Sequence, residues 1–218
     1  NLYYDPEFLT NYEIGFNSQL FNKMMNVSAV IFYSDRDDQQ VLISTQVDPM
    51  DPNTFSFLTQ NAAEGINKGV ELNLDMELSE SVYFFSRFGL LQTDINNWKS
   101  RPDLEGRAQA HAPKKSFALG IIWSLTDRAS LSIDLVGKSS FYYSDSHDNQ
   151  SSSYSLTNIN YDYSIGRWTY SIWARNVFDE YYSVRGFYFG NEAPDFQDTL
   201  YERHGDPKHL GFTARYDF

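Results

Sequence analysis

The feature that most constrains this chain is a strict alternation of apolar and polar side chains, which is clearest at the carboxy-terminus. Apolar residues occupy every second position there, at Leu210, Phe212, Ala214, Tyr216 and Phe218. Because successive side chains of a strand point to opposite faces, this segment predicts a strand with one apolar and one polar face. The apolar face must be covered by other strands, another domain or lipid.

The same period of two recurs along the 218 residues and predicts about nine strands. The segments with this pattern are Thr10–Leu20, Met25–Gln46, Val70–Leu78, Val82–Asp94, Phe117–Leu125, Ala129–Leu135, Tyr154–Ile165, Trp168–Ala174 and the last ten residues. Met25–Gln46 exceeds one membrane crossing of about 9–11 residues, so we expect it to project beyond a bilayer and to bend around Asp35–Asp38. Val82–Asp94 is apolar on both faces. Arg87 favours an inward polar face, since a charge at mid-membrane on the lipid side costs about 2–4 kcal/mol.

Three further features favour a membrane β-barrel over a soluble one. Tight turns, such as Thr126–Arg128, alternate with long polar loops at about Asp48–Leu58, Ile95–Ala112, Ser144–Ser153 and Tyr182–Gly205. Aromatic residues gather near strand ends, as in interfacial girdles. About nine strands cannot close a bacterial single-chain barrel, which has an even number, so we expect this chain to be a segment of a larger barrel.

Composition excludes several other classes of protein. The net charge of −12 argues against a nucleic-acid partner, whose phosphates would be repelled. The absence of cysteine excludes thiolate metal sites and disulfide frameworks. The sequence contains no run of about eighteen apolar residues, so no transmembrane helix is predicted. The chain opens on Asn1 without a signal peptide, and we expect an internal start.

Six short motifs, in order along the chain, resemble the TonB-dependent outer-membrane receptors. They are Tyr12-Glu13-Ile14-Gly15, Phe32-Tyr33-Ser34-Asp35, Gly69-Val70-Glu71-Leu72, Asn176-Val177-Phe178-Asp179, Gly205-Asp206-Pro207-Lys208 and the terminal Phe218. The resemblance implies an all-β, transmembrane antiparallel barrel of the plugged, 22-stranded kind, with residues 1–218 as its carboxy-terminal portion. The plug domain and the early strands would be absent from this chain.

The resemblance also implies a function and partners. The whole protein would sit in the outer membrane of a Gram-negative bacterium and import a scarce ligand with energy from TonB. The commonest cargo in the family is a ferric siderophore; haem, cobalamin or oligosaccharide, or passive diffusion through a porin, remain alternatives. The expected partners are TonB through the missing part, the barrel-assembly machinery, lipid and lipopolysaccharide, and an iron chelate. Neither an enzymatic activity nor a cofactor is expected.

Candidate ligand-binding residues lie in two long loops. Arg185, Phe187, Tyr188 and Phe189 combine a guanidinium with aromatic faces, which suits an anionic iron chelate, although a packed structural hairpin explains them equally well. Trp98 and Arg101 are further candidates. The resemblance assigns a barrel-assembly signal to Leu210, Phe212, Tyr216 and Phe218. The histidines lack the spacing of a metal site, and no catalytic nucleophile with a base is recognisable.

Overall fold

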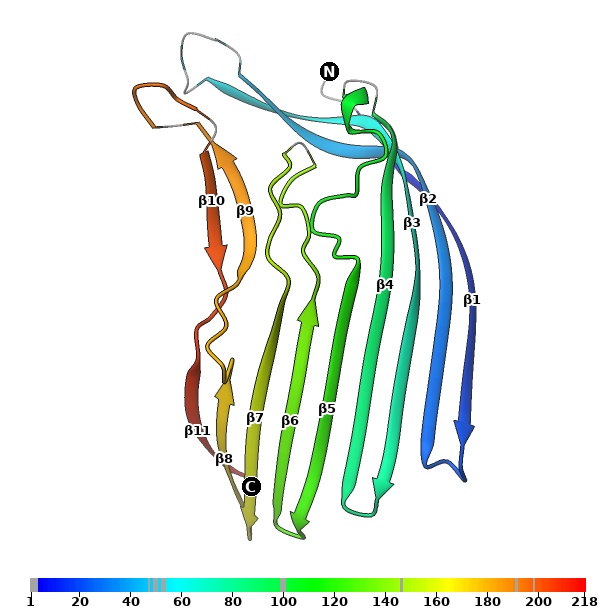
Figure 1. Ribbon diagram of the computed structural model, residues 1–218, viewed down its shortest axis with the longest axis vertical. Coiled ribbons are helices and arrows are strands. Elements are labelled where there is room, and N and C mark those ends of the chain that lie inside the picture. The colour runs from blue at the N-terminus through cyan, green and yellow to red at the C-terminus, as the bar shows by residue number, and fades with distance from the viewer. Residues whose placement is uncertain are drawn as a thin grey trace.

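The computed structural model describes residues 4–46, 48, 51, 54–98, 101–145, 147–190, 192–197 and 199–218. Nine strands form one antiparallel sheet in the order β1-β2-β3-β4-β5-β6-β7-β8-β11, which curves as an open wall (Figure 1). The strands are β1 (Phe8–Leu20), β2 (Met25–Gln46), β3 (Phe55–Ser79), β4 (Val82–Trp98), β5 (Lys115–Thr126), β6 (Ala129–Lys138), β7 (Tyr154–Ile165), β8 (Trp168–Arg175) and β11 (His209–Tyr216). The predicted fold class and the count of about nine strands are confirmed.

Short turns lie at one end of this wall and long connections at the other (Figure 1). At the end with long connections, the chain also forms a 3-10 turn, η1 (Pro102–Leu104), and a separate hairpin of β9 (Ser183–Phe189) and β10 (Thr199–His204). Among the described residues, no helix is long and apolar enough to cross a membrane.

β2 has the predicted bounds and the predicted bend. Its pairing with β3 shifts register on both sides of Gln39, and Asp38 has a positive φ of 53°. The residues that precede β1 hold this bend, since Glu7 accepts a hydrogen bond from the main-chain N–H of Gln40 at 2.9 Å and lies 3.3 Å from the guanidinium of Arg36. The hairpin of β2 and β3 therefore extends well beyond the other strands, and its direction changes at this bend.

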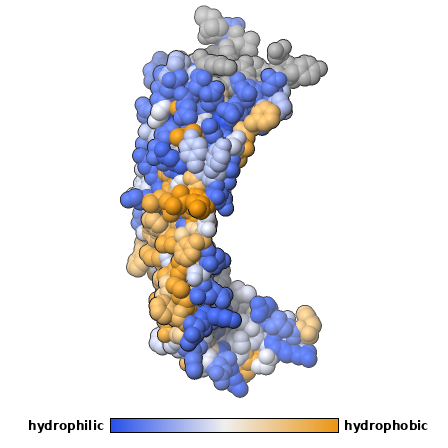
Figure 2. Space-filling view, turned by 90° about the vertical axis from the view of Figure 1, so that its right-hand side faces the viewer, coloured by the Kyte–Doolittle hydropathy of each residue, from blue (hydrophilic) through white to orange (hydrophobic). Residues whose placement is uncertain are grey.

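The two faces of the wall differ as the alternation predicts. Residues directly opposite each other share a face, so the exposed Ile14, Ile31, Val70, Leu90, Ile121 and Ile133 belong to one apolar outer face. Figure 2 shows apolar side chains gathered in a band over the middle and lower part of the molecule, with polar side chains above this band and again at the bottom. Because a single wall leaves its apolar face uncovered, few of the side chains that the structure describes are buried.

Arg87 lies on the inner, polar face, as predicted. It is paired with Asn73, and its guanidinium donates hydrogen bonds to the carboxylate of Asp75 and to the main-chain oxygen of Leu74 at 2.9 Å. Phe88 and Leu90, on the opposite face, are each 39% exposed. A charge thus faces inward while its apolar neighbours face outward.

The predicted boundaries of three long loops are wrong. β3 starts at Phe55, inside the predicted loop Asp48–Leu58, and β4 continues to Trp98, inside Ile95–Ala112. The predicted loop Tyr182–Gly205 contains the β9–β10 hairpin, so Arg185 lies in a paired strand and not in an irregular loop. Beyond a bilayer no alternation is required, and these strand segments therefore carry no period-two signal.

Candidate functional site

The β9–β10 hairpin leaves the wall between β8 and β11, and Asn176 holds its base. Asn176 is 3% exposed and has a positive φ of 47°. Its side-chain amide donates to the main-chain oxygens of Glu180 at 2.9 Å and Asp206 at 3.1 Å, and it accepts from the N–H of Glu180. The carboxylate of Asp179 accepts from the N–H of Lys208 at 2.7 Å. The two ends of the excursion are thereby joined, and β8 can pair with β11.

A second contact fixes the hairpin against the loop between β6 and β7. The carboxylate of Glu202 accepts hydrogen bonds from the buried hydroxyl of Tyr143 and, at 2.9 Å, from Ser183. The hydrogen bond from Tyr143 has the larger effect and that from Ser183 the smaller, and together they hold the pKa of Glu202 below its usual value. Burial, with the bond to Glu202, raises the pKa of Tyr143 to about 12. The ring of Tyr143 covers Gly186, where an added Cβ would lie 2.5 Å from it, so a larger residue at that position would push the hairpin away.

The opposite face of the hairpin is exposed and carries two arginines, and the carboxylate of Glu192 accepts a hydrogen bond from the hydroxyl of Tyr201 on this face. Arg185 lies directly opposite Arg203, and Phe187 lies opposite Tyr201 with the two rings stacked at 5.5 Å. Like charges in directly opposed positions destabilise a strand pair. Among the described residues, no carboxylate forms an ion pair with either arginine. Two free guanidiniums beside two aromatic rings form a surface suited to a delocalised or oxygen-rich anion.

The predicted residues of β9 therefore divide between two faces. Arg185 and Phe187 lie on the exposed face, whereas Tyr188 faces the loop and stacks on His147 with ring centroids 3.6 Å apart. Beside these contacts lies a cavity of about 350 Å³, whose lining includes His111 and Tyr143 from the loops and Arg185, Phe187 and Tyr188 from β9. The main chain of Phe189 is paired, but its side chain lies outside the described residues.

The structure does not bring Trp98 and Arg101 to this surface. Trp98 is 9% exposed and packs in a buried cluster with Ala63, Ile95 and Leu104. Arg101 lies beside η1, where its guanidinium forms an ion pair with Asp103 at 2.8 Å. In the described residues both side chains serve the loop that carries them, and neither contacts the hairpin.

Arg107 connects the two loops that stand behind the hairpin. Its side chain is 12% exposed, forms an ion pair with Asp148 and lies over the ring of Tyr142 at 4.1 Å. It also donates to the main-chain oxygen of His147. The loop after β4 and the loop after β6 are thereby held together as a support for the hairpin.

A serine and a histidine meet at the base of the hairpin, a contact that the sequence did not reveal because they lie 21 residues apart on two strands. The hydroxyl of Ser183 is 3.3 Å from Nδ1 of His204. A hydrolytic triad needs a carboxylate on the far side of the imidazole. Here Glu202 bonds to the serine instead, and Nε2 of His204 bonds to the hydroxyl of Tyr181 at 2.7 Å. The arrangement joins the two strands and lacks the geometry of a nucleophile.

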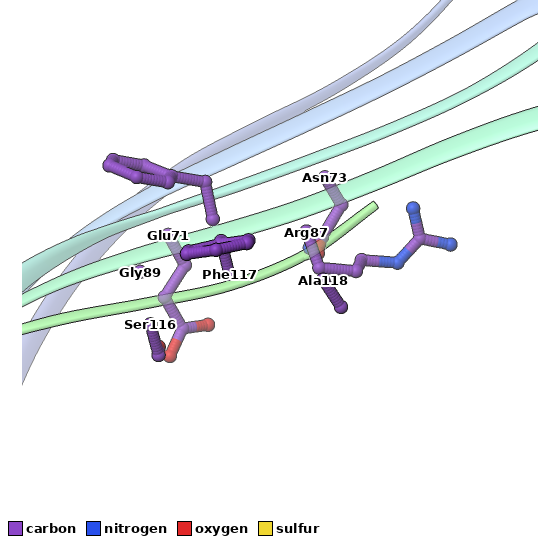
Figure 3. A pocket seen from close by; sticks show the side chains of 8 residues that line it. Glu71, Asn73, Arg87, Gly89, Ser116, Phe117 and Ala118 are labelled. Atoms are coloured by element: carbon purple, nitrogen blue, oxygen red, sulfur yellow. The ribbon is translucent and has the colours of Figure 1, made fainter. Parts of the chain in front are cut away.

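On the inner face of the wall, a cavity of about 310 Å³ lies between Glu71 and Arg87 (Figure 3). Its floor is made of small residues, Gly89, Ser116 and Ala118. Arg87 is held on one side by Asp75, which also accepts a hydrogen bond from Tyr83 at 2.6 Å. Phe117 points to the other side of the sheet (Figure 3). Polar groups thus line the concave side of the wall.

The four residues expected to act in barrel assembly lie at the edge of the wall. Leu210 and Phe212 are 74% and 65% exposed, and Tyr216 shares their outer face. The ring of Phe218 lies 5.1 Å from that of Tyr216. β11 pairs with β8 on one side and, among the described residues, with no strand on the other.

Comparison with a family model identifies residues 1–177 as a match to "TonB dependent receptor-like, beta-barrel". Solved structures of outer-membrane receptors also resemble the chain. It superposes on the ferric yersiniabactin uptake receptor FyuA from Yersinia pestis with a TM-score of 0.80 and 16% identity, over 97% of this chain and 30% of that one. The siderophore receptor PiuA from Acinetobacter baumannii gives a TM-score of 0.72 and 16% identity, over 94% and 28%.

The ferric-catecholate import receptor Fiu from E. coli K12 gives a TM-score of 0.71 and 18% identity, over 99% of this chain and 28% of that one. The chain therefore spans less than a third of the length of these structures. At such identities the likeness concerns the fold. It extends over the nine-stranded wall and the hairpin together, since more than nine-tenths of the chain is covered in each case.

Proposed function

Because this chain belongs to the TonB-dependent receptor-like β-barrel family, we propose that it is the carboxy-terminal barrel portion of an outer-membrane importer. Residues 1–218 form part of the barrel wall, and the remainder of the protein supplies the other strands and a plug that couples to TonB. The cargo is a scarce ligand bound by the long connections at one end of the wall, and a ferric siderophore is the cargo that fits best.

The observation that carries the choice of cargo is the exposed face of the β9–β10 hairpin. Arg185 and Arg203 are adjacent, and no described carboxylate neutralises them. Ferric chelates of the catecholate or carboxylate kind present several oxygen atoms and negative charge, which guanidiniums bind in bidentate fashion. Phe187 and Tyr201 offer flat faces beside them. The solved structures similar to this chain include receptors for ferric yersiniabactin and for ferric catecholates.

Growth on a ferric siderophore as the sole iron source tests this proposal. The full-length protein is expressed in a strain that lacks its own siderophore receptors, with and without TonB. We expect ligand-dependent growth that requires TonB. Growth that persists without TonB would instead identify a passive porin, and growth only with haem, cobalamin or an oligosaccharide would identify a different cargo.

Paired variants separate binding from assembly. Arg185→Gln with Arg203→Gln should raise the apparent dissociation constant of the ferric chelate about tenfold or more, since a hydrogen bond to a charged group contributes about 1.5–3 kcal/mol. The amount of folded barrel should stay unchanged. Arg128→Gln with Arg167→Gln removes the same charge from two short turns and should leave binding unaltered.

The terminal strand has a proposed role of its own. Phe218, Tyr216, Phe212 and Leu210 form the signal that the barrel-assembly machinery recognises, and β11 closes the barrel by pairing with its first strand. Unpaired main-chain groups in hydrocarbon are costly, so closure is required for stability. Deleting Phe218 should reduce the assembled receptor in the outer membrane while synthesis and export continue. Normal assembly of that deletion would contradict the role.

A further inference from the structure

A line of hydrogen bonds crosses the inner face of the wall and ends at the base of the β9–β10 hairpin. The carboxylate of Asp134 on β6 accepts a hydrogen bond at 2.7 Å from the side-chain amide of Asn158, which lies directly opposite it on β7. The side-chain oxygen of Asn158 accepts in turn from the main-chain N–H of Asn176 at 3.1 Å. Asn176 is the residue whose own side chain joins the two ends of the hairpin excursion. Two side chains of the wall therefore reach the hairpin from the inner face.

The register of the strands places Asp134 on that inner face. Its neighbour Ile133 is exposed on the outer face. On the side of β5, Asp134 lies opposite Gly120, which has no side chain to offer. In the part of the chain that the structure describes, Asn158 is the only hydrogen-bonding partner of the Asp134 carboxylate. The carboxylate is therefore committed to Asn158.

This line begins where the main-chain pairing of β7 with β8 stops. The last paired residues are Ile159 and Ala174. Beyond them, the chain after β8 is tied to β7 by the bond from Asn176 to the Asn158 side chain and by a bond from the N–H of Val177 to the main-chain oxygen of Thr157 at 2.9 Å. The Asn158 side chain thus holds the main chain at the point where Asn176, with its positive φ of 47°, leaves the strand conformation.

The carboxylate of Asp134 also determines which way the Asn158 amide is turned. A side-chain amide has one end that donates hydrogen bonds and one that accepts them, whereas an ionised carboxylate only accepts. Asp134 therefore keeps the NH₂ group of Asn158 on its own side and directs the oxygen toward Asn176. Without Asp134 the amide is free to turn, and its NH₂ group forms no hydrogen bond with the N–H of Asn176.

A second carboxylate on the same face makes similar bonds that stay within the wall. Asp162 on β7 accepts from the side chain of Asn160 at 2.6 Å and from the hydroxyl of Ser171. Ser171 lies in the paired part of β8, opposite Asp162 and Thr213. Among the described residues, this network makes no contact with the hairpin base. Asp134 and Asp162 thus share charge, face and kind of partner, and differ in whether the partner holds the hairpin.

We propose that Asp134 and Asn158 are positioning residues for the ligand-binding hairpin, acting from the inner face of the wall through Asn176. Their hydrogen bonds fix the main chain at Asn176, and Asn176 fixes the two ends of the excursion that presents Arg185 and Arg203. The proposal rests on the proposed role of the hairpin in capturing a ferric chelate, but the positioning itself is measured without a ligand. It gives a part in ligand capture to two side chains that lie outside the hairpin and the long loops.

Hydrogen exchange of the purified full-length receptor in detergent tests the positioning. Asp134→Leu should accelerate exchange of the Asn176 amide and of the hairpin amides about tenfold, which corresponds to about 1.4 kcal/mol and is the scale of a lost hydrogen bond to a charged group. The amides of β6 and β7 should keep their exchange rates, because the main-chain pairing of these strands is intact. Asp134→Asn should restore slow exchange, since its side-chain oxygen can still accept from Asn158.

Asp162→Leu is the matched control and should leave exchange of the hairpin unchanged. If Asp134 acts through Asn158, the double variant Asp134→Leu with Asn158→Ala should exchange no faster than Asn158→Ala alone. Three results would each overturn the proposal: unchanged hairpin exchange in Asp134→Leu, equal acceleration in Asp162→Leu, or additive effects in the double variant.

Binding of a ferric tris-catecholate connects the positioning to capture. Asp134→Leu should raise the apparent dissociation constant of this chelate about tenfold, because a displaced hairpin loses at least one charged hydrogen bond to it. Asp162→Leu should leave the constant unchanged. In a receptor that binds the chelate, equal affinity of Asp134→Leu and the unaltered protein would exclude the part in capture. If the unaltered receptor does not bind it, the proposed cargo is wrong, and hydrogen exchange still decides whether Asp134 positions the hairpin.

Discussion

The nine-stranded wall and the β9–β10 hairpin are both antiparallel sheets, but different interactions stabilise them. The wall pairs strands of 8 to 25 residues, with register shifts between β2 and β3, between β3 and β4 and between β5 and β6, and few of its described side chains are buried. The hairpin has only six paired positions and depends on individual side chains, chiefly Asn176, Tyr143 and Glu202. A wall solvated by lipid requires the right polarity at each position, whereas a hairpin in water requires particular contacts.

The largest expected difference between the two regions is their exposure to the cell exterior. We expect the hairpin on the extracellular side and the short turns on the periplasmic side. Since the chain contains no cysteine, single cysteines can be placed at Asp195 and Asp127. On intact cells an impermeant thiol reagent should label Asp195→Cys and leave Asp127→Cys unlabelled. Labelling of Asp127→Cys alone would show that the expected topology is reversed.

In the wall, the free energy of unfolding should depend mainly on the polarity of the side chain at each position. Ile133 is 43% exposed on the outer face, and its neighbour Ser132 lies on the inner face. Ile133→Arg should cost about 2–4 kcal/mol of stability in a bilayer, whereas Ser132→Arg should cost much less. Unfolding in lipid vesicles measures both. Equal losses would show that the assignment of the two faces is wrong.

At the base of the β9–β10 hairpin, local stability should depend mainly on the hydrogen bonds of Asn176. Asn176→Ala leaves the main-chain groups of Glu180 and Asp206 without their partner and should cost about 2 kcal/mol locally. We expect proteases to cleave the hairpin while the wall remains folded, as judged by limited proteolysis and by heat-modifiable migration in gels. Asn176→Asp retains the acceptor for Glu180 and should lose less. A wall that unfolds together with the hairpin would mean that the two regions are not independent.

The smallest expected effect is the pH dependence of the contact between Tyr143 and Glu202. The pKa of Glu202 is lowered from its ordinary value of 4.5 by its hydrogen bonds. The stabilisation is therefore complete above pH 4.5 and is lost as the pH falls through the lowered pKa. Because Glu202 is exposed, we expect about 1 kcal/mol or less. Hydrogen exchange of hairpin amides should accelerate at low pH, relative to the intrinsic rate, and Glu202→Gln should abolish this pH dependence.

Much of the wall could be predicted because a bilayer imposes a rule that each residue obeys separately. Alternation located nine strands, the long β2 and the inward direction of Arg87. The strand ends beyond the bilayer could not be located, because no such rule applies in water. In Ser183–Phe189 polar and apolar residues share the face of Ser183, Arg185 and Phe187, and so its pairing with Thr199–His204 left no alternating pattern in the sequence.

The candidate site was predicted only in part. Arg185 and Phe187 lie on the exposed face as a ligand-binding role requires, whereas Tyr188 stacks on His147 and Trp98 is buried beside Leu104. Sequence reasoning missed Arg203 and Tyr201. A strand register decides which residues lie opposite Arg185 and Phe187, and a register cannot be derived from either segment alone.

The sequence by itself determined the faces of the wall, its approximate strand number and its family, because polarity and short motifs are local properties. The tertiary structure alone decided which distant residues meet. It placed two arginines side by side on the hairpin and brought Asn176 into contact with both ends of the excursion between β8 and β11. These contacts join residues that are far apart along the chain, and their formation depends on pairing and packing that no single segment specifies.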